Sequence, residues 1–315
     1  RYSLKWESTN PLVATVDQNG LVTAVKEGKS IITLRITVDG KESNIIARTT
    51  VTVNNEFIIS GTTLTGYKGN GGDVVIPDDK GILYIGAYAF SLYTTDTSIK
   101  VDENDWDANK TAGGNDTVTS VTIPANVQEV YKYAFYNCSK LKSVNFLSDD
   151  KGNTCKQIKE FAFASNTSLT DINLENIQVI GKSAFANCTA LTDVDLSHIY
   201  ALGEQAFKGC TGISSVNLTT LRNAWKEVFM DCSNLTTFIS GNYTKLSEGM
   251  FKNSGLTSVD IYSDRIPTAA FENCKNLIKV DVMRDIVYVG EGAFKGCSKM
   301  NSFVFRGRSD FIYSN

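Results

Sequence analysis

A repeat of about 22 residues constrains the fold of this 315-residue chain more than any other feature. Each repeat contains one phenylalanine, usually preceded by alanine, which we call the marker and from which we count the other positions of the repeat. The nine markers are Phe90, Phe135, Phe163, Phe185, Phe207, Phe229, Phe251, Phe271 and Phe294. The last seven gaps between them are 28, 22, 22, 22, 22, 20 and 23 residues. A constant period in the twenties is typical of a solenoid in which each repeat forms one rung.

Apolar spacing within the repeat predicts one short strand and one tight turn. Counting from the marker, aliphatic residues lie at minus five, plus six, plus nine and plus eleven. The last two, such as Val194 and Leu196, alternate with period two, so both point inward from a strand. The Ala-Phe pair is expected in a short helical or 3₁₀ turn. Because no rung buries these side chains alone, the rungs must stack. We therefore predict a right-handed leucine-rich-repeat solenoid of about nine rungs with a parallel β-sheet.

Cysteine usage follows the same period. Six of the seven cysteines lie three residues after a marker, namely Cys138, Cys188, Cys210, Cys232, Cys274 and Cys297. This regularity indicates a small apolar side chain packed along the solenoid. Adjacent rungs are close enough for disulfides, so bonding stays open, although free thiols are favoured. Cys155 lies in an insertion and is expected to be the more exposed thiol.

Residues 1–54 lie outside the repeat and predict an all-β domain. Asn19-Gly20 separates alternating apolar residues, which is a strong hairpin signal, and Asp39-Gly40 marks another turn. The segment resembles a bacterial immunoglobulin-like domain of group 2. The resemblance rests on Trp6, Ser8, residues 13–16, Gly20, residues 22–24, Gly28 and residues 32–33. Members of that family have further strands before the tryptophan, so we expect a truncated sandwich.

Residues 55–315 are expected to form the solenoid. Residues 55–77 are predicted to form a β-hairpin cap, because the terminal rungs of solenoids need atypical covers. The long gap after Phe90 contains an insertion over residues 91–117. A smaller insertion covers residues 148–155. The Phe251 repeat is shortened, so a kink or tighter turn is expected near residues 240–262.

The repeat motif I-x-x-I-G-x-x-A-F-x-x-C-x-x-L-x-x-V-x-L-P resembles the BspA-like leucine-rich-repeat family over residues 56–306. This resemblance implies a secreted or cell-surface bacterial protein, and several relatives are adhesins that bind host proteins or other microbes. It supplies no catalytic residues and no cofactor.

Composition gives little support for chemistry. A net charge of −3 provides no electrostatic footprint for nucleic acid, and no apolar run is long enough for a transmembrane helix. His198 is the sole histidine, and nothing marks a serine or acid converging on it. A zinc site would need clustered cysteine and histidine ligands, whereas the cysteines of this chain are spaced about one repeat apart, so no zinc site is expected. The acidic residues 102–107 are a weak calcium candidate, since they lack the EF-hand spacing.

Because the repeated residues form the core, binding residues are expected in the insertions and at the outward-facing positions of the strands. In the insertion these are Trp106, Asp102, Asp105 and Asp107. On the outward strand positions they are Asp171, Asn173, Asp193, Asp195, Asn217, Asp260 and Asp281, with Tyr262 nearby. A second candidate patch at the C-terminal end combines Tyr262, Met283, Arg306 and Phe311. Large aromatics are almost absent from the outward positions, which weakens a glycan-binding sheet and leaves a plain solvated face open.

These observations favour a non-catalytic cell-surface adhesion protein whose solenoid binds a macromolecule, either a host protein or a component of a neighbouring cell. One alternative is a structural spacer within a larger surface protein, with the binding site elsewhere. Another is a glycan-binding surface protein.

Overall fold

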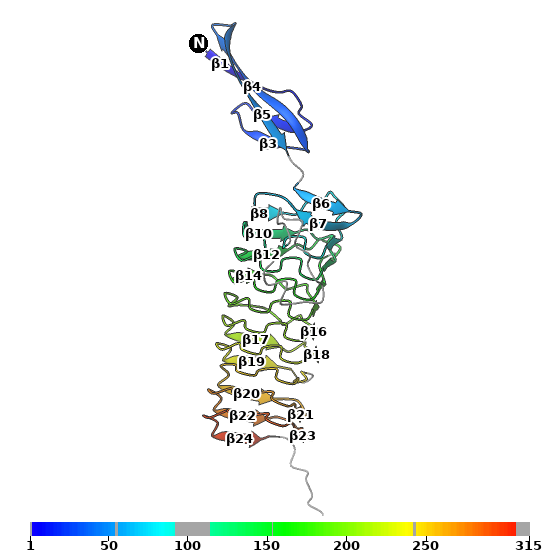
Figure 1. Cartoon of the computed structure of the whole chain (residues 1–315), viewed down its shortest axis with the longest axis vertical. Coiled ribbons are helices and arrows are strands. Elements are labelled where there is room, and N and C mark those ends of the chain that lie inside the picture. The colour runs from blue at the N-terminus through cyan, green and yellow to red at the C-terminus, as the bar shows by residue number, and fades with distance from the viewer. Residues whose placement is uncertain (1, 54–55, 92–113, 153, 242–243, 307–315) are drawn as a thin grey trace, which may run out of the picture. The chain divides into compact units, whose positions relative to one another are not determined.

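A computed structural model describes residues 2–53, 56–91, 114–152, 154–241 and 244–306. Contacts divide the chain into one unit of residues 1–58 and another of residues 59–315. Strands provide all the regular secondary structure of the described residues, and no helix is found among them (Figure 1). None of the described segments could therefore cross a membrane as an apolar helix.

The N-terminal unit contains the strands β1 (Tyr2–Ser8), β2 (Ala14–Val16), β3 (Val22–Ala24), β4 (Gly28–Val38) and β5 (Lys41–Val53). Strands β1, β4 and β5 form an antiparallel sheet, and β2 pairs with β3. The predicted hairpin turn contains Gly20 at φ +84°, where a Cβ would lie 2.6 Å from the Trp6 ring. Only glycine fits this close approach and this conformation. The other predicted turn joins β4 to β5 at Asp39 and Gly40, both with positive φ.

The solenoid has two strand-bearing faces. The long-strand face carries β8 (Gly72–Val75), β10 (Val118–Ile123), β12 (Ser143–Phe146), β14 (Asp171–Ile172), β17 (Ser215–Leu218), β19 (Thr237–Ser240), β20 (Ser258–Ile261), β22 (Lys279–Val282) and β24 (Ser302–Phe305). From β12 onward these strands lie at the predicted positions after the marker. Neighbours within each ladder are parallel and in register, as Val144 beside Ile172 shows.

The short-strand face was not predicted as a sheet. It carries β6 (Phe57–Ser60), β7 (Thr63–Tyr67), β9 (Tyr84–Ile85), β11 (Glu129–Val130), β13 (Gln157–Ile158), β15 (Val179–Ile180), β16 (Ala201–Leu202), β18 (Asn223–Ala224), β21 (Arg265–Ile266) and β23 (Tyr288–Val289). Most of the two-residue strands place a buried aliphatic at minus five. The exceptions are β18, where Ala224 is half-buried, and β23, where Val289 is 54% exposed. The sheet β18-β16-β15-β13-β11-β9-β7-β6 is continuous, and β6 lies next to β7 at its end.

Both ladders are interrupted at the shortened Phe251 repeat. The long-strand face is split there between β19 and β20, and the short-strand face between β18 and β21. The long-strand face is also split between β14 and β17, because residues 191–196 of the Phe185 rung form no strand. Deleting residues from one rung moves its carbonyl and amide groups out of register with those of the neighbouring rung. The interruption lies where the sequence predicts a kink or tighter turn.

Stacked marker rings form the centre of the core. Neighbouring rings from Phe90 to Phe294 lie 4.5–5.7 Å apart between centroids, and their planes differ by no more than 19°. The rings from Phe90 to Phe271 are fully buried. Such offset-stacked pairs stabilise the core beyond their burial alone.

The turn at the marker is not the helical or 3₁₀ turn expected from sequence. In the Phe185 rung, the Ala184 amide bonds to Gly181 within the turn, whereas the Ser183 amide bonds to Glu204 in the next rung. Amides thus alternate between closing a turn and bridging rungs. Ser183 and Asn187 adopt positive φ of 50° and 61° to allow this. A helix would direct all these amides within one rung, and the inter-rung bonds would be lost.

The periodic cysteines are structural. Each thiol donates to the carbonyl of the preceding marker phenylalanine, for example Cys210 Sγ to Phe185 O at 3.0 Å. None of the seven cysteines forms a disulfide bond. Burial raises the pKa of Cys138 and Cys188 to about 12. The prediction that Cys155 is exposed is wrong: it is 1% exposed, because the chain after the small insertion returns to the core beside β13.

Candidate binding site at Trp225

The outer surface of the short-strand face is shaped by glycines four residues before the marker. Gly181 and Gly203 occupy this position in successive rungs. A Cβ on Gly203 would lie 2.5 Å from the backbone carbonyl carbon of Gly181, and one on Gly181 would lie 2.7 Å from that of Lys159. Rungs therefore pack backbone to backbone here, and neither of these two positions carries a side chain that could cover the surface.

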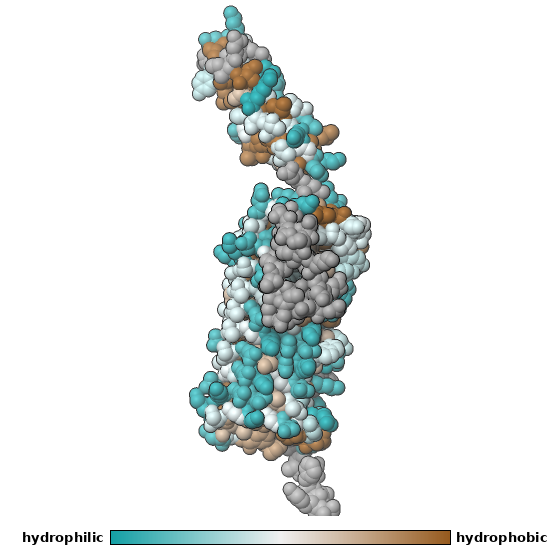
Figure 2. Space-filling view, in the orientation of Figure 1, coloured by the Kyte–Doolittle hydropathy of each residue, from teal (hydrophilic) through white to brown (hydrophobic). Residues whose placement is uncertain are grey.

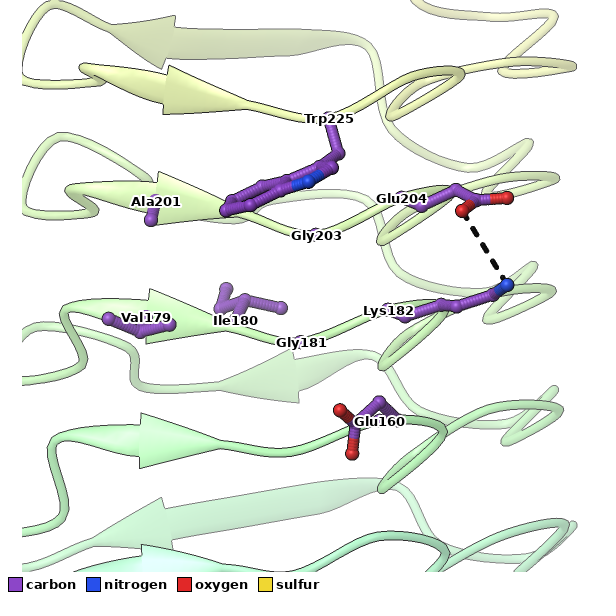
Figure 3. A pocket seen from close by; sticks show the side chains of 9 residues that line it. All are labelled: Glu160, Val179, Ile180, Gly181, Lys182, Ala201, Gly203, Glu204 and Trp225. Carbon is purple, nitrogen blue, oxygen red and sulfur yellow. Dashed lines mark ion pairs between the residues drawn. The ribbon is translucent and has the colours of Figure 1, made fainter.

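Trp225 occupies the same position in the next rung. Its indole extends over the preceding rung and lies above the bare glycine surface (Figure 3). Val179, Ile180 and Ala201 line the same pocket, which has a volume of about 300 Å³. Trp225 is 58% exposed. The arrangement presents a flat aromatic face beside an apolar depression.

Alternating charges border this pocket. Glu160, Lys182 and Glu204 lie at the minus-three position of consecutive rungs, and Lys226 continues the row. The Lys182 ammonium lies 3.5 Å from the Glu204 carboxylate (Figure 3). The Lys226 ammonium lies 3.7 Å from the same carboxylate. Opposite charges at equivalent positions of adjacent rungs favour the observed register. The pocket therefore combines an apolar floor with a rim of both charge signs.

The outward residues predicted on the long-strand face lie in rows on successive rungs. Asp171, Asn173, Asp193, Asp195 and Asp260 are exposed, and Asn217 is half-buried. The side of the solenoid seen in Figure 2 is mainly hydrophilic where it is not drawn in grey.

Three of these side chains bind backbone. Asn173 accepts from Phe146 N at 2.7 Å and donates to its carbonyl at 3.0 Å. Asp195 accepts from Ser197 N at 2.8 Å, and Asn217 accepts from Thr219 N at 3.1 Å. Hydrogen bonds from Ser197 lower the pKa of Asp195. These three side chains therefore stabilise the backbone of the long-strand face.

The remaining predicted residues differ in their surroundings. Asp281 is only 5% exposed, and its Oδ2 lies 2.6 Å from the Lys279 ammonium and 3.4 Å from Arg306. Tyr262 is half-buried beside Arg284 in a polar pocket. Of the predicted C-terminal patch, Met283 is half-buried and Arg306 exposed. Trp106, Asp102, Asp105, Asp107 and Phe311 lie outside the described residues, as does the proposed calcium loop.

His198 has a serine and an aspartate nearby but does not form a catalytic relay with them. Ser197 Oγ lies 3.0 Å and Asp195 Oδ2 4.0 Å from the same ring nitrogen, Nδ1. A relay requires the acid and the nucleophile on opposite nitrogens. Within the part of the chain that the structure describes, no group of three or more metal-ligating side chains is present.

Sequence reasoning missed Trp225. Outward positions were sought only around the long strand, and the short-strand face was not recognised as a surface. The available signal was the replacement of glycine by tryptophan at the minus-four position, directly after Gly181 and Gly203.

Family models match both parts of the chain. The model for the BspA type leucine rich repeat region matches four overlapping segments, at residues 67–150, 109–236, 156–277 and 201–315. The chain belongs to the BspA-type leucine-rich repeat family. A bacterial Ig-like domain of group 2 matches residues 2–44, which agrees with the predicted partial domain. No curated protein sequence is similar enough to count as a match.

Solved structures share the fold of this BspA-type chain. A leucine-rich repeat protein from Bacteroides ovatus is 22% identical with a TM-score of 0.55, and the match covers 81% of this chain and 71% of that protein. The pneumococcal vaccine antigen PcpA is 18% identical with a TM-score of 0.53, covering 92% of this chain and 69% of that one. At these identities the likeness shows the fold alone.

Proposed function

We propose that this chain is a non-catalytic adhesion protein of the bacterial cell surface that binds a partner protein on a host or neighbouring cell. The observation that carries the proposal is the exposed indole of Trp225 beside its apolar pocket. Tryptophan is enriched among the residues that dominate binding energy, because a large rigid ring buries much surface at low entropic cost.

The pocket fits one protruding apolar side chain of a partner. Val179, Ile180 and Ala201 supply the apolar wall, and Glu160 with Lys182 lies at the rim. Such a site, with an apolar centre and charged edge, has the usual anatomy of a small protein interface. Membership in the BspA-type family supports the proposed extracellular location.

A spacer role is the second candidate function. This role is favoured because several outward side chains form hydrogen bonds or ion pairs within the solenoid. Asn173 and Asn217 hold backbone, and Lys182 pairs with Glu204 between rungs. Side chains that already have such intramolecular partners are less available for hydrogen bonds or ion pairs with another protein.

Binding of the purified 315-residue chain to immobilised extracellular-matrix proteins, measured by biolayer interferometry, tests the proposal. Trp225→Ala should weaken binding by roughly 30-fold or more, the loss typical of a hot-spot residue. Trp225→Phe should retain part of the affinity. Ile239→Ala, which truncates a 55% exposed side chain on the long-strand face, is the matched control and should leave affinity unchanged.

Two results would count against the adhesion proposal. Absence of binding to every protein in the panel would favour the spacer. Binding that is equally strong in the Trp225→Ala variant would place the partner site elsewhere on the chain. A neutral glycan that binds only when Trp225 is present would instead support the glycan-binding alternative.

A further inference from the structure

A second surface combines several cations in a groove. Two adjoining pockets, of about 400 and 380 Å³, share Arg222. They lie where the chain passes from the long-strand face to the short-strand face. The residues that give the groove its charge and its aromatic faces are Tyr200, Arg222, Lys245, Tyr262, Asp264 and Arg284.

The groove residues come from five consecutive rungs. Tyr200 belongs to the Phe207 rung, Arg222 to the next, and Lys245 to the one after that. Arg284 belongs to the Phe294 rung, two rungs beyond Lys245. With rungs about 4.8 Å apart, the three cations are distributed along roughly 15 Å. The groove therefore suits an extended ligand that lies along the solenoid.

The charge of the groove is positive, although the chain as a whole carries −3. Three cations face one carboxylate, that of Asp264. Among the described residues, neither Lys245 nor Arg284 has a carboxylate within ion-pairing distance. Since Lys245 and Arg284 are exposed like charges without such a carboxylate, the groove is suited to an anionic ligand.

The other groups in the groove indicate which kind of anion fits. Tyr200 is 47% exposed and Tyr262 half-buried, and these rings offer apolar faces between the cations. The Asp264 carboxylate can accept hydrogen bonds from hydroxyl groups but repels a densely charged phosphate chain. A ligand that alternates anionic groups with hydroxyls and apolar ring faces satisfies all three features.

We propose that this groove binds an acidic glycan whose carboxylate or sulfate groups pair with Arg222, Lys245 and Arg284. Its sugar rings pack on Tyr200 and Tyr262, and a sugar hydroxyl donates to Asp264. The inference rests on the surface location proposed above but uses none of the side chains that line the Trp225 pocket.

Titration calorimetry of the full chain with heparin, hyaluronan and neutral dextran tests the inference, with poly-glutamate and a single-stranded oligonucleotide as competing polyanions. Heparin covers the sulfated case and hyaluronan the carboxylate-only case. At least one of these two should bind, and dextran should not. The Lys245→Gln/Arg284→Gln double variant should weaken that binding at least tenfold.

Lys140→Gln/Lys275→Gln removes the same charge from exposed positions outside the groove and is the matched control. It should bind the glycan as the parent chain does. Equal loss in both double variants would show unspecific charge attraction and overturn the proposal. So would the absence of binding to both acidic glycans, or tighter binding of poly-glutamate or the oligonucleotide than of either glycan.

The Trp225→Ala variant separates this inference from the proposed adhesion function. It should bind the acidic glycan normally. If glycan binding is absent while Trp225-dependent protein binding persists, the groove proposal alone fails. If glycan binding persists without any protein partner, the protein-adhesion proposal alone fails.

Discussion

Asn166 lies three residues after its marker, at the position that carries cysteine in six other rungs. Its side chain is completely buried, and neither amide atom has a hydrogen-bond partner among the described residues. Burying a polar group without a partner costs about 1–3 kcal/mol. A cysteine here would remove both unpartnered atoms. Its thiol would face the Phe135 carbonyl, as Cys188 faces that of Phe163 at 3.1 Å.

Asn166→Cys should therefore raise the free energy of unfolding by about 1–3 kcal/mol. Urea unfolding followed by circular dichroism measures this as a higher midpoint with an unchanged slope. Asn166→Ser should give a smaller gain, because Ser254 occupies the same position in the Phe251 rung and lies 3.3 Å from Cys274 Sγ. Asn301→Cys introduces the same residue at an exposed site and should change stability by less than about 0.5 kcal/mol.

A midpoint that is unchanged or lowered in Asn166→Cys would refute the reasoning. It would mean that the amide is satisfied in solution, for instance by a buried water, so that the substitution removes bonds instead of unpartnered atoms. A changed slope would point to loss of cooperativity along the repeat array, and the midpoint would then not measure the cost at Asn166.

Three further predictions concern the core and the last rungs. Phe207→Ala should lower the free energy of unfolding by about 3–5 kcal/mol in the same assay, because it removes a ring stacked on both sides; a loss below about 1 kcal/mol would contradict the inward assignment. In the native protein at pH 8, a thiol reagent should modify the half-buried Cys297 before Cys188, whose pKa is about 12; rapid labelling of Cys188 would contradict its burial. Lys279 and Arg306 lower the pKa of Asp281, so its contribution to stability should be complete above the unfolded pKa of about 3.9 and be lost as the pH falls through the folded pKa. Asp281→Asn should flatten that acid dependence in urea midpoints, and an unchanged dependence would contradict it.

The long-strand face could be predicted because each rung places two inward aliphatics two residues apart. In β17, Val216 and Leu218 alternate with the outward Ser215 and Asn217, which is the pattern of a half-buried strand. The short-strand face has only two residues per rung, with one inward aliphatic such as Ile180. A single apolar position has no period, so a strand there cannot be distinguished from a turn. Only the stacking of rungs shows that these positions form a ladder.

The marker turn was predicted as helical because the local pattern contains closely spaced apolar residues. What decides its conformation is the neighbouring rung, which supplies acceptors for alternate amides. Ser183 and Asn187 adopt positive φ, and this conformation directs their amides to carbonyl groups of the next rung. The frequent asparagine, aspartate or glycine two residues after the marker was a local sign of this conformation, since these residues tolerate it best.

The regularity of the repeat separates structure from function on this solenoid. A side chain that recurs from rung to rung, such as the marker phenylalanine in all nine or the cysteine in six, is explained by contacts between rungs. Binding must then depend on residues that depart from the pattern. Trp225 departs from it by replacing the glycine of the two preceding rungs, and Arg222, Lys245 and Arg284 lie in turns whose residues differ from rung to rung. The two proposed sites therefore make opposite predictions under one perturbation. Raising the salt concentration should weaken glycan binding at the groove steeply, because screening acts on exposed charges, and should leave Trp225-dependent binding nearly unchanged.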